Sequence, residues 1–313
     1  MEVVTGFSFK RILKDNKNWN RFVNRVSNLR DAIFENIVKV LVCRTPILGG
    51  HTLVCEHCGI EKIIPHSCKS RACSSCGKKL TDQWIQKSQD ILPKTKWQHI
   101  TFTMPDKLWE FFWYNRELFN LIAPMPAEIL TKMAKKKGVI PGIFMAIHTF
   151  GRDLKRNVHF HVSITLGGLS LSKDRWIGTL YIHHAPLKTQ WRYHVVNAFR
   201  NAYKEGNLVL PKSLTHIKTY TEFNAWLDKL YQKNWVVHLG PPQNDHQRNI
   251  EYLGRYLKRP PLSETNIKNY DGETVTFAYH DHHQGTTNHM KLPVLDFIGR
   301  VVQHIPDKYF RME

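Results

Sequence analysis

Apolar residues near the start of the chain recur at intervals of three and four. In the stretch from Phe9 to Val42 they are Phe22, Val23, Val26, Leu29, Ile33, Ile37 and Val40. Because an α-helix has about 3.6 residues per turn, this spacing gathers apolar side chains on one face. The pattern predicts an amphipathic helical lead-in. Gly49 and Gly50 then punctuate the chain, and helical character resumes only over 79–92.

Short runs rich in β-branched and aromatic residues predict the strands of a sheet. They are Gln98–Met104, Ile143–Phe150, Val158–Leu166, Trp235–Leu239 and Thr274–Tyr279. A turn-like stretch over 151–157 separates the second run from the third, which predicts a hairpin. Helical patterns occupy 107–137, with a break at Pro124 and Pro126, and also 189–204, 221–232, 249–258 and 294–304.

The amino-acid composition indicates what kind of partner the protein binds. Of the 313 residues, 42% are hydrophobic and 23% are charged, as in an ordinary folded protein. Lys and Arg number 45 against 26 Asp and Glu, which gives a formal net charge of +19. An excess of this size favours a polyanionic partner, most commonly nucleic acid. A basic protein without a nucleic-acid role is the alternative that charge alone leaves open.

The sequence shows no sign of export. The first thirty residues, Met1 to Arg30, lack an apolar core of signal-peptide length, and no run of about 18 apolar residues occurs. We therefore expect no membrane partner and a bacterial cytoplasmic location, at the nucleoid when the protein is bound to DNA. In a reducing compartment, clustered cysteines indicate metal ligation rather than disulfides.

The cysteines form two pairs of the kind that binds zinc. Cys55 and Cys58 make one Cys-x2-Cys pair, and Cys73 and Cys76 make another, fourteen residues further on. Each pair can present two thiolates from a tight turn, and two pairs complete a tetrahedral structural site. The predicted ligands of a structural Zn²⁺ are therefore these four residues.

Other donors and cations lie between the two pairs. Cys68, His57 and His66 could substitute for a ligand or bind a second ion, and the sequence does not choose among these arrangements. Lys69 and Arg71 predict that this module contacts nucleic acid. A redox or disulfide role for the cysteines, and a merely solvated basic surface, are the alternatives.

A second group of metal donors lies on a predicted strand. Side chains alternate along a strand, so His159 and His161 point to one face while Phe160 points to the other. Two imidazoles make half a metal site. His148, on the preceding strand of the hairpin, is the candidate third ligand, with Asp153 or another carboxylate as the fallback. An open site of this kind suits Mg²⁺ or Mn²⁺ acting on a phosphate.

A pair of tyrosines supplies a candidate nucleophile. Tyr252 and Tyr256 are four residues apart on a predicted helix, so both phenols lie on one face. Arg255, Lys258 and Arg259 surround them, predict DNA contacts, and favour the nucleophilic phenolate. Taken alone, paired tyrosines are more often core or interface residues.

Together these segments resemble the two-tyrosine HUH-endonuclease transposases of rolling-circle insertion sequences. The segments that carry the resemblance are Leu48–His51, Cys55–Cys58, His66–Cys76, His148–Leu154, His159–His161 and Tyr252–Tyr256. They span most of the chain in the family's order. The resemblance implies an α+β fold, in which an antiparallel-sheet, ferredoxin- or RRM-like HUH domain follows a helical lead-in and a small Cys-rich zinc module.

The implied organisation has four parts. They are a helical amino-terminal region over 1–50, a zinc-binding module over 51–92, an HUH catalytic domain with the tyrosine helix over 93–262, and a carboxy-terminal strand and helix over 263–313. Family members continue past the segment matching Ile305–Met312 with a basic, tyrosine-containing tail, whereas this chain ends at Glu313. The resemblance therefore supports nicking ahead of complete transposition.

The resemblance also implies a mechanism and a substrate. The metal held by His159 and His161 would polarise the scissile phosphate of single-stranded DNA at transposon ends. Attack by Tyr252 or Tyr256, in an order that the sequence leaves open, would give a 5′-phosphotyrosine and a free 3′-hydroxyl. Strand transfer would need no ATP, in keeping with the lack of a Gly-x4-Gly-Lys-[Ser/Thr] loop.

Two other functions share some of these features. One is a non-catalytic, zinc-dependent DNA-binding protein that occupies transposon ends. The other is a replication initiator or plasmid relaxase, which shares the histidine pair and the tyrosine chemistry. The cysteine module ahead of the catalytic region, and the missing nucleotide loop, favour a transposase over both the initiator and the relaxase.

Overall fold

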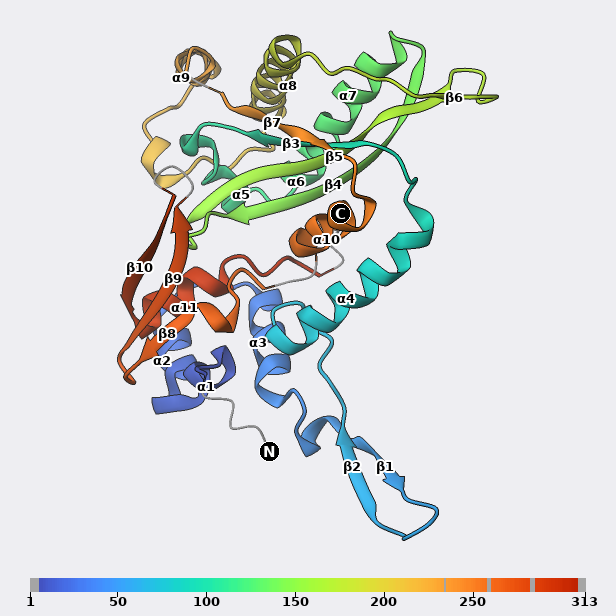
Figure 1. The fold of residues 1–313 in the computed structure, drawn as a ribbon. Helices are drawn as coiled ribbons and strands as arrows, with labels where there is room; N and C mark the ends of the chain where they lie inside the picture. Colours follow the sequence, from blue (N-terminus) through green and yellow to red (C-terminus); the bar gives the residue numbers. More distant parts are fainter. Residues whose placement is uncertain (1–5, 234, 258–259, 282–284, 309–313) are drawn as a thin grey trace. The chain divides into compact units, whose positions relative to one another are not determined.

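The computed structural model describes residues 6–233, 235–257, 260–281 and 285–308 (Figure 1). They form two compact units: unit 1 lies within 1–86, 150–155 and 257–311, and unit 2 lies within 87–149 and 156–256. Helices and antiparallel strands are mixed in the chain, which confirms the predicted α+β class. In the described part of the chain, no helix has the length and apolar character needed to cross a membrane.

Unit 1 begins with three helices rather than one continuous lead-in. They are α1 (Phe9–Lys14), α2 (Asn18–Arg25) and α3 (Asp31–Val42). The breaks coincide with left-handed backbone: φ is 49° at Asn16, 52° at Lys17 and 63° at Asn28. Asparagine tolerates this conformation better than most residues, because its short polar side chain can bond locally. The apolar periodicity therefore predicted helices correctly but could not show these turns.

The later part of unit 1 is a three-stranded antiparallel sheet followed by a helix. The strands are β8 (Ile267–Tyr270), β9 (Thr274–Asp281) and β10 (Thr286–Pro293), in the order β10-β9-β8, and α11 (Val294–Val302) follows. The α11 helix packs on α2, where a Cβ on Gly299 would lie 3.3 Å from the ring of Phe22. Only the smallest residue allows so close an approach without a shift of that ring.

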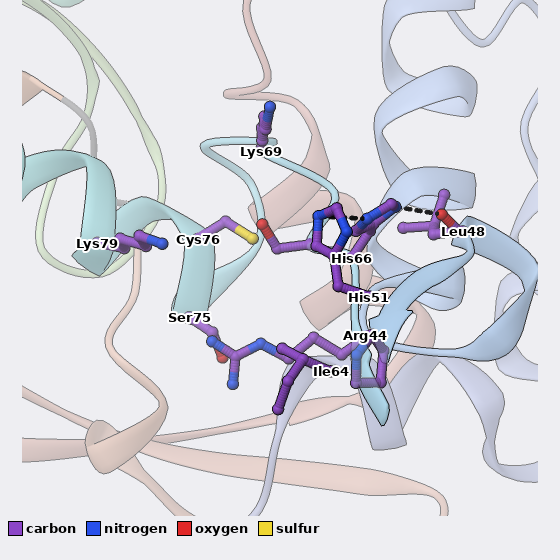
Figure 2. Close-up of a pocket in the computed structure, with 11 residues that line it drawn as sticks. Arg44, Leu48, His51, Ile64, His66, Lys69, Ser75, Cys76 and Lys79 are labelled. Carbon is purple, nitrogen blue, oxygen red and sulfur yellow. Dashed lines mark hydrogen bonds between the residues drawn. The ribbon is translucent and has the colours of Figure 1, made fainter. Parts of the chain in front are cut away.

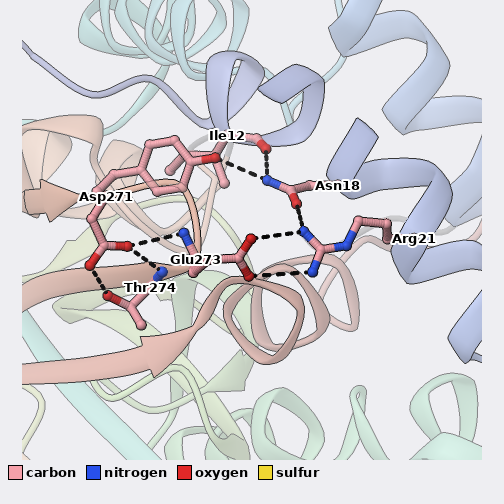
Figure 3. Close-up of polar contacts among 7 residues, drawn as sticks. Ile12, Asn18, Arg21, Asp271, Glu273 and Thr274 are labelled. Carbon is pink, nitrogen blue, oxygen red and sulfur yellow. Dashed lines mark hydrogen bonds and ion pairs between the residues drawn. The ribbon is translucent and has the colours of Figure 1, made fainter. Parts of the chain in front are cut away.

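A buried asparagine joins the first helices to this sheet (Figure 3). The Asn18 amide is fully buried and donates to the Ile12 carbonyl and to the Tyr270 hydroxyl, both at 3.0 Å. Its oxygen accepts from Arg21 at 2.9 Å, and Arg21 also pairs with Glu273 at 3.3 Å. Because a buried amide without partners would be costly, this network fixes α2 against the β8–β9 turn.

The Cys-rich segment forms a hairpin and the start of a long helix. Strands β1 (Gly50–Val54) and β2 (Glu61–Pro65) pair antiparallel, with Gly50 opposite Pro65 and Val54 opposite Glu61. The α4 helix (Ser74–Ile91) starts five residues before the predicted position. Cys76 therefore lies in the first turn of a helix rather than in a loop.

Unit 2 is built on a sheet whose core order is β4-β5-β3-β7. Its strands are β3 (Trp97–Thr103), β4 (Val139–Phe150), β5 (Arg156–Ser170), β6 (Trp176–Ile177), which pairs with the end of β5, and β7 (Val237–Gln243). The strand β3 is central and antiparallel to β5 and β7. Its register sets His99 opposite Ser163 and Thr101 opposite His161.

Alternation along these strands gives the sheet two different faces. Phe102 on β3 and Phe160 on β5 are fully buried, and both rings contact Trp191 of α8. The helices of unit 2 are α5 (Phe111–Tyr114), α6 (Leu118–Ile122), α7 (Met125–Lys135), α8 (His184–Lys204), α9 (Tyr220–Tyr231) and α10 (His246–Leu257). In Figure 1, α10 lies on the side of the sheet opposite α8. The histidines of β5 face the α10 side.

Candidate active site and metal centres

Four cysteine sulphurs meet in unit 1. They belong to Cys43, Cys68, Cys73 and Cys76, and all four Sγ atoms lie within 4.8 Å of one another. Three of the sulphur–sulphur contacts, Cys43–Cys76, Cys68–Cys76 and Cys73–Cys43, measure 3.7 Å. A tetrahedral zinc with Zn–S bonds of about 2.3 Å requires sulphur–sulphur edges of about 3.8 Å. The donor set therefore fits a closed, structural Zn²⁺ site.

The cluster also has the electrostatics of a thiolate site. The Cys68 thiol bonds to Cys73 and lowers the pKa of Cys73 to about 5. In the same pair, the bond to Cys73 and then burial raise the pKa of Cys68, and burial raises that of Cys43. Four adjacent sulphurs cannot all be ionised without a cation, because like charges oppose one another. A bound Zn²⁺ would stabilise all four as thiolates.

This group differs from the predicted ligand set. Cys73 and Cys76 are in it, Cys68 is a full member rather than a substitute, and Cys43 takes part although it precedes the Cys-rich segment. Cys55 and Cys58 are exposed residues of the β1–β2 hairpin and are not in the group. The helix α3 explains the difference, because it ends at Val42 and delivers Cys43 from a distant part of the sequence.

Cys55 and Cys58 form a tight pair of their own. The Cys55 amide donates to the Ile60 carbonyl at 2.9 Å, and the Gly59 amide donates to the Cys55 carbonyl at 2.8 Å. Hydrogen bonds from Cys58, first from its amide and then from its thiol, lower the pKa of Cys55. The turn has the form of a metal-binding pair, but its thiols are exposed and lie at the tip of the hairpin. Cys55 and Cys58 as zinc ligands remain a prediction.

Three histidines meet on the sheet of unit 2. His148 on β4 and His159 and His161 on β5 each offer a ring nitrogen, and these atoms lie within 4.8 Å of one another. The ring centroids are 4.7 Å apart for His148–His161 and for His159–His161. The structure thus brings the predicted third ligand to the predicted pair. Asp153, the fallback, lies outside this group.

Burial favours the neutral, metal-binding form of His159 and His161. His159 donates from Nδ1 to the Asn157 carbonyl at 2.8 Å, which leaves Nε2 to face the group. Burial lowers the pKa of His159 to about 4 and that of His161 well below its usual range. A neutral imidazole with one nitrogen bound in this way is the usual form of a histidine ligand. The donor set fits one divalent ion.

The tyrosine helix reaches the same side of the sheet. Tyr252 lies on α10, and its ring meets the His99 ring edge-on, with centroids 4.6 Å apart. His99 Nε2 lies 3.0 Å from His161 Nδ1, and the two rings are stacked with centroids 5.1 Å apart. A chain of direct contacts therefore joins the phenol of Tyr252 to the histidine triad through His99.

His99 and Cys43 are the two residues that sequence reasoning missed. The signal for His99 was its strand period: it shares a face with Thr101, which pairs with His161. Burial first, and then the charges of His238 and His159, lower the pKa of His99 to about 4. The signal for Cys43 was weak, because the sequence does not show that the end of α3 lies in space beside Cys68, Cys73 and Cys76.

The other predicted residues are placed as follows. Tyr256 and Arg255 lie in the last turns of α10, where the structure describes the backbone, and Lys258 and Arg259 lie outside the described residues. Lys69 lines a pocket beside the cysteine cluster, and Arg71 lies two residues further along the same loop. The backbone therefore places both tyrosine positions on one helix, as the spacing predicted.

Comparisons with known proteins find two matching families. A family described as "Transposase zinc-binding domain" matches residues 15–104, and one described as "Putative transposase" matches residues 142–313. The first match contains all four clustered cysteines, and the second contains the histidine triad and Tyr252. No solved structure matches the chain.

Two curated relatives extend over most of the sequence. The chain is 37% identical over 306 residues to "Transposase for insertion sequence element IS801" of Pseudomonas savastanoi pv. phaseolicola, covering 97% of this chain and 74% of that protein. It is 27% identical over 280 residues to "Putative transposase y4qJ" of Sinorhizobium fredii (strain NBRC 101917 / NGR234), covering 87% and 70%. These matches indicate a DNA-processing enzyme with a zinc-binding domain. The chain belongs to the two-tyrosine transposase family of rolling-circle insertion sequences.

Proposed function

We propose that this transposase nicks single-stranded DNA at the ends of its insertion sequence, with Tyr252 as a nucleophile. The strand would become covalently joined to the protein through a 5′-phosphotyrosine and would then be transferred in rolling-circle transposition. The observation that carries the proposal is the contact chain from Tyr252 through His99 to His161. It brings a nucleophile and a metal-binding group to one face of one sheet.

The reaction exchanges one phosphate ester for another. The Tyr252 phenol loses its proton to solvent, and its oxygen forms a bond to phosphorus. The bond between phosphorus and the 3′-oxygen breaks, and that oxygen leaves with the electron pair and takes up a proton as the 3′-hydroxyl. Because the number of phosphate ester bonds is unchanged, a second strand end can reverse the step without ATP.

The histidine triad would hold the ion that this step needs. His148, His159 and His161 are the ligands, and His99 orients His161 through its Nδ1. When bound, a divalent ion polarises the scissile phosphate and offsets the charge that develops on it. Because all the donors of the triad are imidazole nitrogens, they suit Mn²⁺ better than Mg²⁺, which prefers oxygen ligands.

Tyr256 is the proposed second nucleophile. It follows Tyr252 by four residues on α10, and residues at this spacing lie on the same face of a helix. Two nucleophiles on one face would allow a donor strand and an acceptor strand to be attached in turn. Which tyrosine acts first is left to experiment.

A strand-specific adduct assay tests the proposal. Single-stranded DNA of the transposon end, labelled at its 3′ end, is incubated with the protein and Mn²⁺ and then run on a denaturing gel. The labelled strand should migrate with the protein, whereas a 5′-labelled copy should be released as a shorter free fragment. Tyr252→Phe should abolish or strongly reduce the adduct, while Tyr193→Phe, at an exposed position on α8, should not.

Other outcomes would support the alternatives. DNA binding without any adduct, in Mn²⁺ or Mg²⁺, would indicate the non-catalytic DNA-binding protein. An adduct on a replication or transfer origin, but not on transposon ends, would indicate an initiator or a relaxase. An adduct that survives Tyr252→Phe but not Tyr256→Phe would move the first attack to Tyr256.

A further inference from the structure

A basic pocket lies beside the cysteine cluster in unit 1 (Figure 2). Its volume is about 770 Å³, and Cys76 of the cluster forms part of its wall. Three cations line it, namely Arg44 after α3, Lys69 in the loop before α4 and Lys79 on α4. The remaining lining residues are Leu48, His51, Ile64, Pro65, His66, Ser67 and Ser75. None of the lining residues is acidic, so the pocket concentrates positive charge.

The three cations form no ion pair with a carboxylate in the part of the chain that the structure describes. The adjacent Lys78, in contrast, pairs with Asp82 at 3.3 Å. Figure 2 shows that the three side chains come from different elements. Three like charges around one cavity repel one another, and a bound anion would relieve this repulsion.

Two of the cations occupy backbone positions that normally favour glycine. φ is 55° at Arg44 and 54° at Lys69, in the left-handed region that is unfavourable for residues with a Cβ. Residues in this region persist where the surrounding structure holds them, and they are frequent in binding sites. The backbone at these two positions is therefore held by its surroundings, beside the pocket.

Neutral hydrogen-bonding groups complete the lining. The His66 Nδ1 lies 2.9 Å from the Leu48 carbonyl, and its Nε2 lies 3.1 Å from His51 Nε2. The hydroxyls of Ser67 and Ser75 are donors for a tetrahedral anion. Ser75 and Cys76 also lie in the first turn of the 18-residue helix α4, where the helix dipole favours negative charge.

From these features we propose that the pocket binds a backbone phosphate of DNA, at a site separate from the histidine triad. An internal phosphodiester is the expected occupant, because DNA is the partner that family membership implies. Guanidinium and ammonium groups are the usual phosphate ligands in such contacts. The inference rests on the proposed function only for its DNA partner, and not on any cleavage step.

Neutral-phosphate scanning tests the proposal. Single-stranded transposon-end oligonucleotides each carry one methylphosphonate in place of a phosphate, and their affinities are measured without added Mn²⁺ or Mg²⁺ and without chelator, so that no cleavage occurs and the structural zinc is kept. Wild type should lose about tenfold in affinity or more at one or two positions, as expected for a lost charge-assisted contact. Arg44→Gln and Lys79→Gln should bind the unmodified strand more weakly and show no further loss at those positions.

The salt dependence supplies an independent measure. Each lost contact with a single strand should reduce the slope of log affinity against log salt by about 0.7. Lys62→Gln, at an exposed position on β2 outside the pocket, should keep the position-specific losses of wild type. An oligonucleotide without a 5′-terminal phosphate should bind as well as one that carries it, since the site takes an internal phosphodiester.

Three results would overturn the proposal. Loss of Zn²⁺ together with affinity in Arg44→Gln or Lys79→Gln would show that the cations only balance the charge of the thiolates. Pocket variants that lose affinity equally at every phosphate would indicate a general basic surface. A loss confined to the 5′-terminal phosphate would identify an end-binding site. Because all these measurements concern binding, they remain valid even if Tyr252 proves not to be the nucleophile.

Discussion

His99 contacts both the tyrosine helix and the histidine triad. Its Nε2 lies 3.0 Å from His161 Nδ1, and its ring packs against Tyr252. In the proposed mechanism, such a residue would fix the orientation of a metal ligand, His161, and of the nucleophile, Tyr252, together. Partners of this kind typically change metal affinity or activity by 10- to 100-fold when they are removed. We therefore expect His99 to be a positioning residue for strand cleavage.

Replacing His99 should separate binding from chemistry. His99→Ala should slow adduct formation by roughly 10- to 100-fold and raise the Mn²⁺ concentration needed for half-maximal activity. DNA affinity should stay within about twofold, because distributed basic contacts dominate it. Single-turnover adduct kinetics over a Mn²⁺ titration measure both effects. An unchanged Mn²⁺ requirement with a lower rate would assign His99 to the tyrosine alone.

The buried histidines predict a pH dependence of folding stability. The pKa values of His99 and His159 fall from an ordinary value near 6.5 to about 4 in the folded chain. Between pH 6.5 and pH 4 the unfolded chain therefore binds protons that the folded chain does not. Stability present above pH 6.5 is lost as the pH falls, by up to about 1.4 kcal/mol per pH unit for each histidine.

Urea unfolding of the metal-free protein at several pH values checks this expectation. The free energy of unfolding should decrease from pH 6.5 to pH 4.5. His159→Gln, which cannot titrate, should show a smaller decrease over the same range. A flat profile for wild type would mean that the histidines are accessible to protons in the folded state.

Among the elements, the strands were the most predictable. Alternation along β5 placed His159 and His161 on one face, and the hairpin with β4 brought His148 to them. Both inferences need only the period of a strand and a short connection. The ring of Tyr252 against His99 could not be predicted, because it depends on where α10 packs across the sheet.

The cysteine cluster, in contrast, could not be predicted from the sequence in full. Spacing favoured Cys55 and Cys58, because two Cys-x2-Cys pairs are the commonest pattern of a zinc site. The β1–β2 hairpin extends the chain between the two pairs, and the end of α3 supplies Cys43. The spacing of cysteines along the sequence cannot identify a candidate ligand, such as Cys43, that only tertiary packing brings to the cluster.

Two serine variants distinguish the ligand sets. Cys43→Ser should lower bound zinc and destabilise unit 1, because it removes one of four clustered sulphurs. Cys55→Ser should leave that zinc in place. Zinc content by atomic emission and thermal unfolding measure both. If Cys55→Ser lost as much zinc as Cys43→Ser, the sequence-based set with Cys55 and Cys58 would be supported.

The Asn18 network predicts the strength of a helix-to-sheet connection. Asn18→Ala removes an amide that bonds Ile12, Tyr270 and Arg21 inside unit 1. Buried partners would lose their hydrogen bonds, so the free energy of unfolding should fall by about 2–3 kcal/mol. Asn24→Ala, at an exposed position on the same helix, should change it by less than about 0.5 kcal/mol. Equal effects of the two changes in denaturant titrations would contradict this role.

On the scale of the whole molecule, the chain divides in a way that sequence order hides. Unit 1 combines residues within 1–86 with residues within 257–311, together with the short segment 150–155. Apolar periodicity identifies helices and strands but not which distant ones share a core. The contacts of Asn18 with Tyr270, and of Gly299 with Phe22, are long-range and leave no local signal.

This division predicts a local response to zinc removal. Binding of a structural zinc contributes to folding free energy, so a strong chelator should destabilise unit 1 and leave unit 2 largely folded. Hydrogen exchange should accelerate in peptides from α3 and the start of α4, and should stay slow in β5 and α8. Faster exchange throughout both units would show that they unfold as one cooperative body.

The all-imidazole composition of the triad has a consequence for the order of assembly. The donors on His148, His159 and His161 are all imidazole nitrogens, and burial favours the neutral form of His159 and His161. Neutral imidazole ligands bring no countercharge to a divalent ion, so we expect their affinity for the ion alone to be modest. An incoming DNA strand carries that countercharge on its phosphate. Metal and DNA should therefore bind cooperatively, each strengthening the affinity for the other by the same factor, so that the proposed catalytic site would hold little metal until a strand is present.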